Sequence, residues 1–136
     1  MDALRSTILA AAIVAAPAPA LADSCWTHNG SLMRLEAEGP ARLFSYEKPK
    51  AGLAAAGIRK HTLLFDGEKS GNWYSGTARV FSKSCPGSPL EYHVEGPVNS
   101  SQTRVEMTGE REVYENCQPT GRRTVDTLVF RYSHQC

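Results

Sequence analysis

The protein is a chain of 136 residues with a formal net charge of +1 at neutral pH and four cysteines. A chain of this length forms one domain, and its near-neutral charge lacks the basic excess that attracts nucleic acid or an anionic membrane. We therefore expect neither partner, and we expect no stable membrane insertion, because no segment has the roughly 20 apolar residues of a membrane span.

The N-terminal segment has the pattern of a cleavable export signal. A head with one arginine, Arg5, precedes an apolar run over residues 6–16, and Ala20-Leu21-Ala22 is the small-x-small pattern that signal peptidases cleave. The alternatives are a buried N-terminal helix and a lipoprotein anchored through Cys25, but the residues before Cys25 lack the lipoprotein pattern. We predict a signal peptide over residues 1–22, export to the periplasm or the extracellular space, and one mature domain over residues 23–136.

All four cysteines lie in the predicted mature domain, and an even number in a small exported domain indicates disulfides. Three pairings are possible. We favour Cys85–Cys117, which staples a central segment, and Cys25–Cys136, which ties the two ends together. No cysteine or histidine has the spacing of a zinc or redox site, so we expect no metal and no cofactor.

The first half of the mature domain alternates strand patterns with glycine and proline turns. Residues 31–38 and 41–48 each alternate apolar and polar side chains, and the Gly39-Pro40 break between them predicts a hairpin. Residues 53–56 are the one place where we expect a helical turn. The apolar run 62–65 predicts a strand.

The run over 62–65 meets a turn signal, Asp66-Gly67, where we expect the strand to end, and a second polar turn is expected at residues 70–72. Residues 73–82 predict a longer strand. The composition of Cys85-Pro86-Gly87-Ser88-Pro89 predicts a loop.

The last third contains the most regular pattern. Residues 90–95 alternate with a period of two, residues 103–108 and 111–114 predict a further strand, residues 118–121 a loop and residues 124–132 a final strand. Seven or eight short strands without a βαβ rhythm predict an all-β, antiparallel barrel or sandwich. We favour the barrel, because closure between the first and last strands fits the preferred disulfide pairing.

Two segments are candidates for binding a partner: the turn over residues 26–31 and the loop over residues 66–72. Both are rich in glycine, asparagine and serine, and each lies beside a tryptophan. The candidate binding residues are Trp26, His28, Asn29, Asp66, Asn72 and Trp73. The alternative for Trp26 is burial against the Cys25 disulfide.

The remaining polar residues show no catalytic or metal-binding pattern. The four histidines are scattered, and we interpret them as solvent-exposed. Glu91, His93 and Glu95 share one strand face, which could meet a cation or a basic partner or could be a solvated outer surface. Ser75 precedes a glycine but lies in mid-strand, so it does not form a nucleophile elbow.

Several segments resemble uncharacterised small exported proteins of alphaproteobacteria. They are residues 25–35, 62–67, 74–81, 117–121 and 126–130. Similar segments are also associated with the tails of some bacterial caspase-like peptidases, which implies an accessory role. The resemblance implies a source and a compartment, but it supplies no catalytic residue.

These observations favour a non-enzymatic binding module whose partner is a protein or an envelope glycan. The alternative is an inhibitor of a hydrolase such as lysozyme, and the third hypothesis is a small hydrolase.

Overall fold

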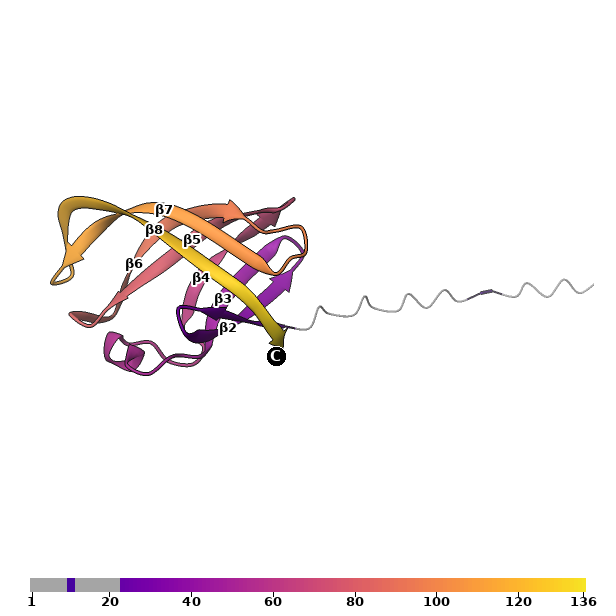
Figure 1. The fold of residues 1–136 in the computed structure, drawn as a ribbon, viewed down its shortest axis with the longest axis horizontal. Helices are drawn as coiled ribbons and strands as arrows, with labels where there is room; N and C mark the ends of the chain where they lie inside the picture. The colour runs from indigo at the N-terminus through magenta and orange to yellow at the C-terminus, as the bar shows by residue number, and fades with distance from the viewer. Residues whose placement is uncertain (1–9, 12–22) are drawn as a thin grey trace, which may run out of the picture.

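The structure is a computed structural model that describes residues 10–11 and 23–136. Nearly all of the predicted export signal lies outside the described residues, so it stays a prediction. From Ser24 onward the chain forms eight antiparallel strands, which follow one another around a closed barrel (Figure 1). Pairing of the first strand with the last closes the barrel, which confirms the barrel rather than the sandwich.

The strands are β1 (Ser24–His28), β2 (Ser31–Glu38), β3 (Ala41–Lys48), β4 (Leu63–Ser70), β5 (Trp73–Ser82), β6 (Cys85–Pro97), β7 (Arg104–Glu115) and β8 (Gln118–Gln135), with a 3-10 turn η1 (Leu53–Ala56) between β3 and β4. Because neighbours in space are neighbours in sequence, the connections alternate between two ends of the barrel. The end with Ser24 and Gln135 is called the terminal end. The other, with the connections at residues 29–30, 49–62, 83–84 and 116–117, is called the open end.

The predicted hairpin of β2 and β3, the helical turn and the strand over residues 73–82 are confirmed. The predicted turn at Asp66-Gly67 is wrong, because β4 runs through both residues to Ser70. A Cβ on Gly67 would lie 2.6 Å from Cζ of Phe65 and 2.8 Å from Cα of Gly76. This glycine therefore serves close packing inside a strand and not a turn.

Two predicted loops are also wrong. Residues 85–89 belong to β6, yet β6 pairs in register with β5 only at Cys85 and again from Leu90 onward. Prolines lack an N–H, so they fit an extended stretch that forms no ladder. Residues 118–121 belong to β8, because Asn116 and Cys117 form a two-residue turn with φ of 50° and 62°.

The predicted turn over residues 26–31 is too long, because only Asn29 and Gly30 lie between β1 and β2. Their φ values of 47° and 81° suit a two-residue hairpin turn. Ser24–His28 are a strand because β1 pairs with β2 on one side and with β8 on the other.

Aromatic side chains fill the centre of the barrel. The rings of Phe44 and Phe130 stack with centroids 3.9 Å apart, and the ring of Trp26 meets Phe44 edge-on at 5.8 Å. The large side chains that are at most 3% exposed in this core are called the packed region: Trp26, Met33, Phe44, Phe65, Tyr74, Val94, Val98, Val105, Met107 and Phe130. Their burial provides the main driving force for folding.

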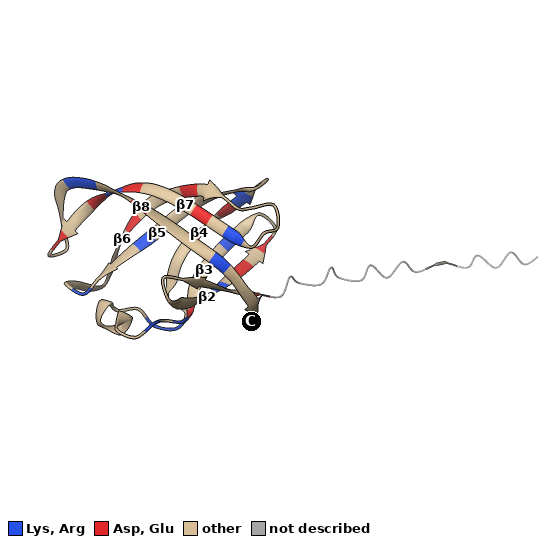
Figure 2. Ribbon diagram, viewed as in Figure 1, with Lys and Arg blue, Asp and Glu red and all other residues tan. Residues whose placement is uncertain are grey.

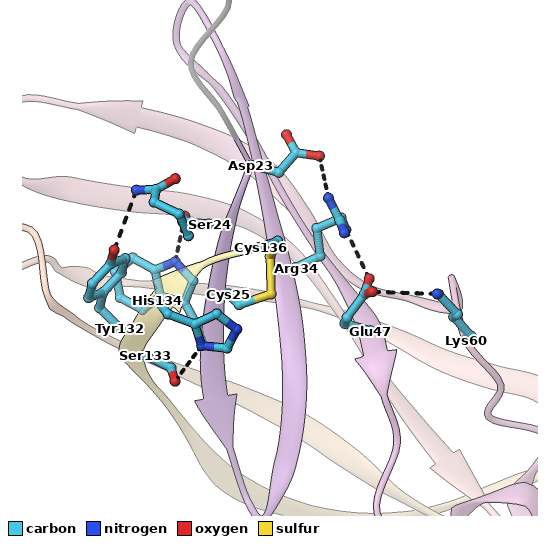
Figure 3. Close-up of a disulfide and its surroundings, with 12 residues drawn as sticks. Asp23, Ser24, Cys25, Arg34, Glu47, Lys60, Tyr132, Ser133, His134 and Cys136 are labelled. Carbon is cyan, nitrogen blue, oxygen red and sulfur yellow. Dashed lines mark hydrogen bonds and ion pairs between the residues drawn. A yellow bond between two sulfur atoms is a disulfide. The ribbon is translucent and has the colours of Figure 1, made fainter.

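Both predicted disulfides are confirmed. Cys25–Cys136 joins β1 to the C-terminal residue, beside a chain of ion pairs that links Asp23, Arg34, Glu47 and Lys60 (Figure 3). Cys85–Cys117 joins the β5–β6 hairpin to the β7–β8 hairpin at the open end. Among the described residues, no helix is long and apolar enough to cross a membrane.

Candidate functional site

The barrel wall has a gap between β6 and β7 toward the open end. The two strands pair at Val98↔Val105 and Glu95↔Thr108, and no register pair between them lies nearer the open end in the part of the chain that the structure describes. In Figure 1 the two strands diverge toward the left of the view. The Cys85–Cys117 disulfide joins the two hairpins again beyond the gap. The gap between the Glu95↔Thr108 pair and this disulfide is called the side opening.

A cleft of about 630 Å³ lies at the side opening. Its walls come from β5, β6 and β7 and from the Cys85–Cys117 disulfide, and its apolar lining includes Val80, Phe81, Leu90, Val113 and Tyr114. The polar side chains of Glu91 and Arg111 also line it. The cleft can therefore accept an apolar group and offers charged groups at its margin.

A second, smaller pocket of about 250 Å³ lies inside the barrel and is called the inner pocket. It is lined by residues of β1, β4, β5, β6 and β8, which surround the barrel interior on several sides. Val80 lines both spaces. The inner pocket is more polar than the cleft, since His28, Asn29, Tyr92 and Asp126 line it.

A hydrogen-bonded network separates the two spaces. Oδ2 of Asp126 accepts hydrogen bonds from the Tyr92 hydroxyl at 3.1 Å and from Nε of Arg111 at 2.5 Å. The side chains of Arg111 and Asp126 are 19% and 29% exposed, so both charges are largely withdrawn from water. Among the described residues no hydrogen bond reaches the other carboxylate oxygen, Oδ1, which leaves it free to accept one from a ligand.

Strand alternation explains why these charged side chains point inward. Arg111 continues the inward series of Val105 and Met107 on β7, and Asp126 precedes Leu128 and Phe130 in the inward series of β8. Burial, and after it the negative charge of Asp126, raises the pKa of Tyr92 well above its ordinary value. The phenol therefore stays protonated and donates its hydrogen bond throughout the physiological pH range.

His28 is a second polar group of the inner pocket, and its interpretation as solvent-exposed is wrong, since only 7% of it is exposed. Its ring stacks on Phe130 at 4.4 Å, and its Nδ1 lies 2.9 Å from the carbonyl oxygen of Val129. Burial, assisted by the charge of Lys50, lowers the pKa of His28. The imidazole is then neutral, Nδ1 donates to the carbonyl, and Nε2 is an acceptor.

Of the predicted binding residues, the structure brings only His28 and Asn29 together at the inner pocket, where Nδ2 of Asn29 lies 3.4 Å from Nε2 of His28. Trp26 is 3% exposed, donates from Nε1 to Oγ of Ser24 and belongs to the packed region. Asp66 lies in mid-strand and accepts a hydrogen bond from Arg79.

Asn72 and Trp73 lie at the terminal end, where Oδ1 of Asn72 accepts a hydrogen bond from Gln102. The two predicted segments are therefore not parts of one surface, and binding at their residues stays a prediction.

Tyr92, Arg111 and Asp126 were not predicted as site residues. The sequence did contain a signal for Arg111 and Asp126. In a strand every second side chain points inward, and a charged residue at such an inward position, where an apolar one is expected, indicates a possible site. Arg111 and Asp126 both meet that criterion. Their contact depends on the register between β7 and β8, in which Gly109 faces Asp126 and Arg111 faces Thr124.

No protein-family model matches the chain, and no curated protein matches it. The solved structure of a rhizavidin–biotin complex is similar, with a TM-score of 0.53 and 12% sequence identity over 82% of this chain and 92% of that chain. At this identity the likeness shows the fold. The chain forms an eight-stranded closed barrel whose fold is similar to that of rhizavidin.

Proposed function

We propose that the chain is an exported, non-enzymatic binding module that holds its ligand at the open end of the barrel, across the cleft and the inner pocket. The observation that carries this proposal is the network of Tyr92, Asp126 and Arg111 between the two spaces. A withdrawn ion pair is often no more stable than apolar residues of similar volume, so stability gives little reason to retain one here. A few polar groups converging beside apolar walls are typical of a ligand site.

The fold and the disulfides support the proposal. Rhizavidin, a barrel of the same kind, was solved as a complex with biotin, so this architecture can accommodate a small molecule. The two disulfides favour an oxidising compartment, in agreement with export.

Ligand-induced thermal stabilisation of the mature protein tests this function. The probes are biotin, soluble peptidoglycan fragments and fractionated envelope extract. We expect one class to raise Tm by several degrees, and we expect Arg111→Gln and Asp126→Asn to weaken its binding at least tenfold. Arg104→Gln and Glu106→Gln are matched controls, because this ion pair lies on the surface near the terminal end. A ligand that binds the site variants as tightly as the wild type would contradict the proposed site.

One observation favours inhibition of a hydrolase as a second candidate. The β7–β8 hairpin ends in the polar residues Glu115, Asn116 and Gln118, and beside them Tyr114 is 39% exposed. An exposed aromatic side chain on a hairpin can act as an interface anchor. Inhibition of lysozyme by the mature protein, lost in Tyr114→Ala, would support this candidate, and its absence at micromolar concentrations would dismiss lysozyme as the target.

A further inference from the structure

We propose that a hollow beside the β1–β2 turn is an oxyanion-binding site, which takes a phosphate, sulfate or carboxylate group. The hollow has a volume of about 390 Å³ and lies between that turn and the segment that follows β3. It is called the lysine hollow, and it shares no lining residue with the cleft or the inner pocket. This inference therefore goes beyond the proposed function and does not depend on it.

The polar side chains that line the lysine hollow can all donate hydrogen bonds. Lys48 and Lys50 supply two ammonium groups, and Thr27 and Ser31 supply two hydroxyl groups. The lining contains no aspartate or glutamate. An oxyanion is the complementary ligand, because its oxygens accept hydrogen bonds and its charge is opposite to that of the lysines.

The two lysines are not neutralised by a protein carboxylate. Both are exposed, and neither ammonium group has an ion pair or a hydrogen bond with a described residue. Glu47 precedes Lys48 in the chain, but its carboxylate pairs with Arg34 at 2.9 Å and with Lys60 at 3.5 Å. The positive charge of the lysine hollow is therefore available to a ligand.

Backbone contacts hold Lys50 at the lysine hollow. Its N–H donates to Oγ of Ser31 at 3.0 Å, and its carbonyl oxygen accepts from the N–H of Leu53 at 3.4 Å. Its Cδ lies 3.4 Å from the position that a Cβ on Gly30 would occupy, so the side chain runs along the β1–β2 turn.

The hydroxyl of Ser31 adds a buried donor to the lysine hollow. Ser31 is only 3% exposed, and its oxygen already accepts the hydrogen bond from Lys50. No described residue accepts a hydrogen bond from this hydroxyl, so its proton is available to an oxyanion. A buried hydroxyl beside two free ammonium groups distinguishes the lysine hollow from a surface that merely carries lysines.

The connection between β3 and β4 extends the positive charge around the lysine hollow. Residues 49–62 contain Lys50, Arg59 and Lys60 but no aspartate or glutamate. The blue segments on this connection in Figure 2 mark these basic residues. An anion that approaches this part of the open end meets a positive potential, which favours its encounter with the lysine hollow.

The test is a titration of the isotope-labelled mature protein with inorganic phosphate at constant ionic strength, followed by the NMR signals of the backbone amides. We expect saturable shifts at Gly30 and Ala51, which line the lysine hollow. Lys48→Gln and Lys50→Gln should each weaken phosphate binding roughly two- to fivefold, as expected for exposed charge pairs, and the double variant on the order of tenfold.

Lys83→Gln is the matched control. Lys83 is also an exposed lysine of the open end, but it does not line the lysine hollow. Its replacement lowers the net charge by the same amount, and phosphate binding should equal that of the wild type. Because the ammonium groups of Lys48 and Lys50 contact no described residue, their variants should keep the wild-type Tm, which separates loss of the site from loss of the fold.

Glucose 1-phosphate, a phosphate monoester, distinguishes two sources of the oxyanion. Binding of the monoester at least as tightly as inorganic phosphate would indicate an acidic group carried by a larger molecule. Binding of inorganic phosphate alone would indicate the free ion. Either result supports the oxyanion site.

Absence of saturable shifts at Gly30 and Ala51 would overturn the inference. An equal loss of affinity in Lys50→Gln and Lys83→Gln would overturn it as well, because diffuse attraction by surface charge would then explain the binding. Neither result bears on the proposed function, since the phosphate titration does not involve Arg111 or Asp126.

Discussion

The packed region and the open end use the same strand alternation with opposite results. In the packed region the inward positions are aromatic or aliphatic, as at Phe44, Phe65 and Phe130, none of which is accessible to solvent. At the open end the inward positions include Tyr92, Arg111 and Asp126, and two pockets lie among them. One part of the barrel thus supplies most of the hydrophobic stability, and this allows the other part to keep polar groups.

Glycines mark the boundary between these regions on β6 and β7. A Cβ on Gly96 would lie 1.8 Å from the carbonyl oxygen of Glu106, and one on Gly109 would lie 2.1 Å from that of His93. The two strands approach closely where these glycines leave room. Beyond Gly109 the inward residues of β7 are Arg111 and Val113, and the strands separate. The side opening therefore begins where the small residues end.

Removal of a disulfide should have the largest effect on the free energy of unfolding, and it tests the contrast between the packed region and the open end. Cys25–Cys136 closes a separation of 111 residues and Cys85–Cys117 one of 32. In the chain-entropy model, replacing both cysteines of a pair by serine should cost about 5 kcal/mol for the first and about 4 kcal/mol for the second. Urea unfolding measures both. We expect ligand binding to weaken only when Cys85–Cys117 is removed, and the opposite assignment would contradict a division between a stabilising and a binding end.

Truncation inside the packed region should have the next largest effect. Phe130→Ala removes a ring that stacks on both Phe44 and His28, and should lower the free energy of unfolding by about 3–5 kcal/mol. Val125→Ala on the same strand is the control, since Val125 is 63% exposed, and its effect should stay within about 0.5 kcal/mol. Similar losses in the two variants would show that the barrel centre is not the main source of stability.

The network of Tyr92, Asp126 and Arg111 at the open end should contribute less to the free energy of unfolding than the packed region does. Asp126→Ala leaves Arg111 and Tyr92 without their shared acceptor and should cost about 1–3 kcal/mol. Glu106→Ala breaks a surface ion pair with Arg104 and should cost at most about 1 kcal/mol. If Asp126→Ala proved more stable than the wild type while ligand binding was lost, the contrast would be sharper still, because the network would then serve binding at the expense of stability.

The smallest expected effect is a dependence of stability on pH at His28. Burial lowers the pKa of His28 in the folded protein below the ordinary value of 6.5 that applies to the unfolded chain. The unfolded chain therefore takes up a proton first as the pH falls. Stability from this group is complete above about pH 6.5 and is lost as the pH falls toward the lowered pKa.

His28→Gln should reduce the difference in unfolding free energy between pH 8 and pH 5, whereas His134→Gln, at an exposed position, should leave that difference unchanged. Equal pH dependence in wild type and His28→Gln would show that His28 does not contribute to it.

The sequence by itself indicated an all-β, antiparallel fold with two disulfides, and the structure confirmed the barrel and the pairing that we favoured. Period-two runs such as residues 31–38 and 90–95 require one buried face, and strands without a βαβ rhythm favour an antiparallel barrel or sandwich. The errors at Asp66-Gly67 and at residues 85–89 share one cause. Glycine and proline were interpreted as turn residues, but here the tertiary packing uses glycine for close approach and tolerates proline where β6 has no ladder partner.

The candidate site could be identified only from the tertiary structure. Tyr92, Arg111 and Asp126 come from three strands and are separated by at least fifteen residues along the chain, so their contact exists only once the barrel has closed with its particular register. The same holds for the end at which each predicted residue lies: Asn29 and Asn72 occupy similar turns, yet strand direction places them at opposite ends of the barrel. Alternation along one strand follows from local geometry, whereas convergence across strands depends on the pairing register, which a single sequence does not reveal.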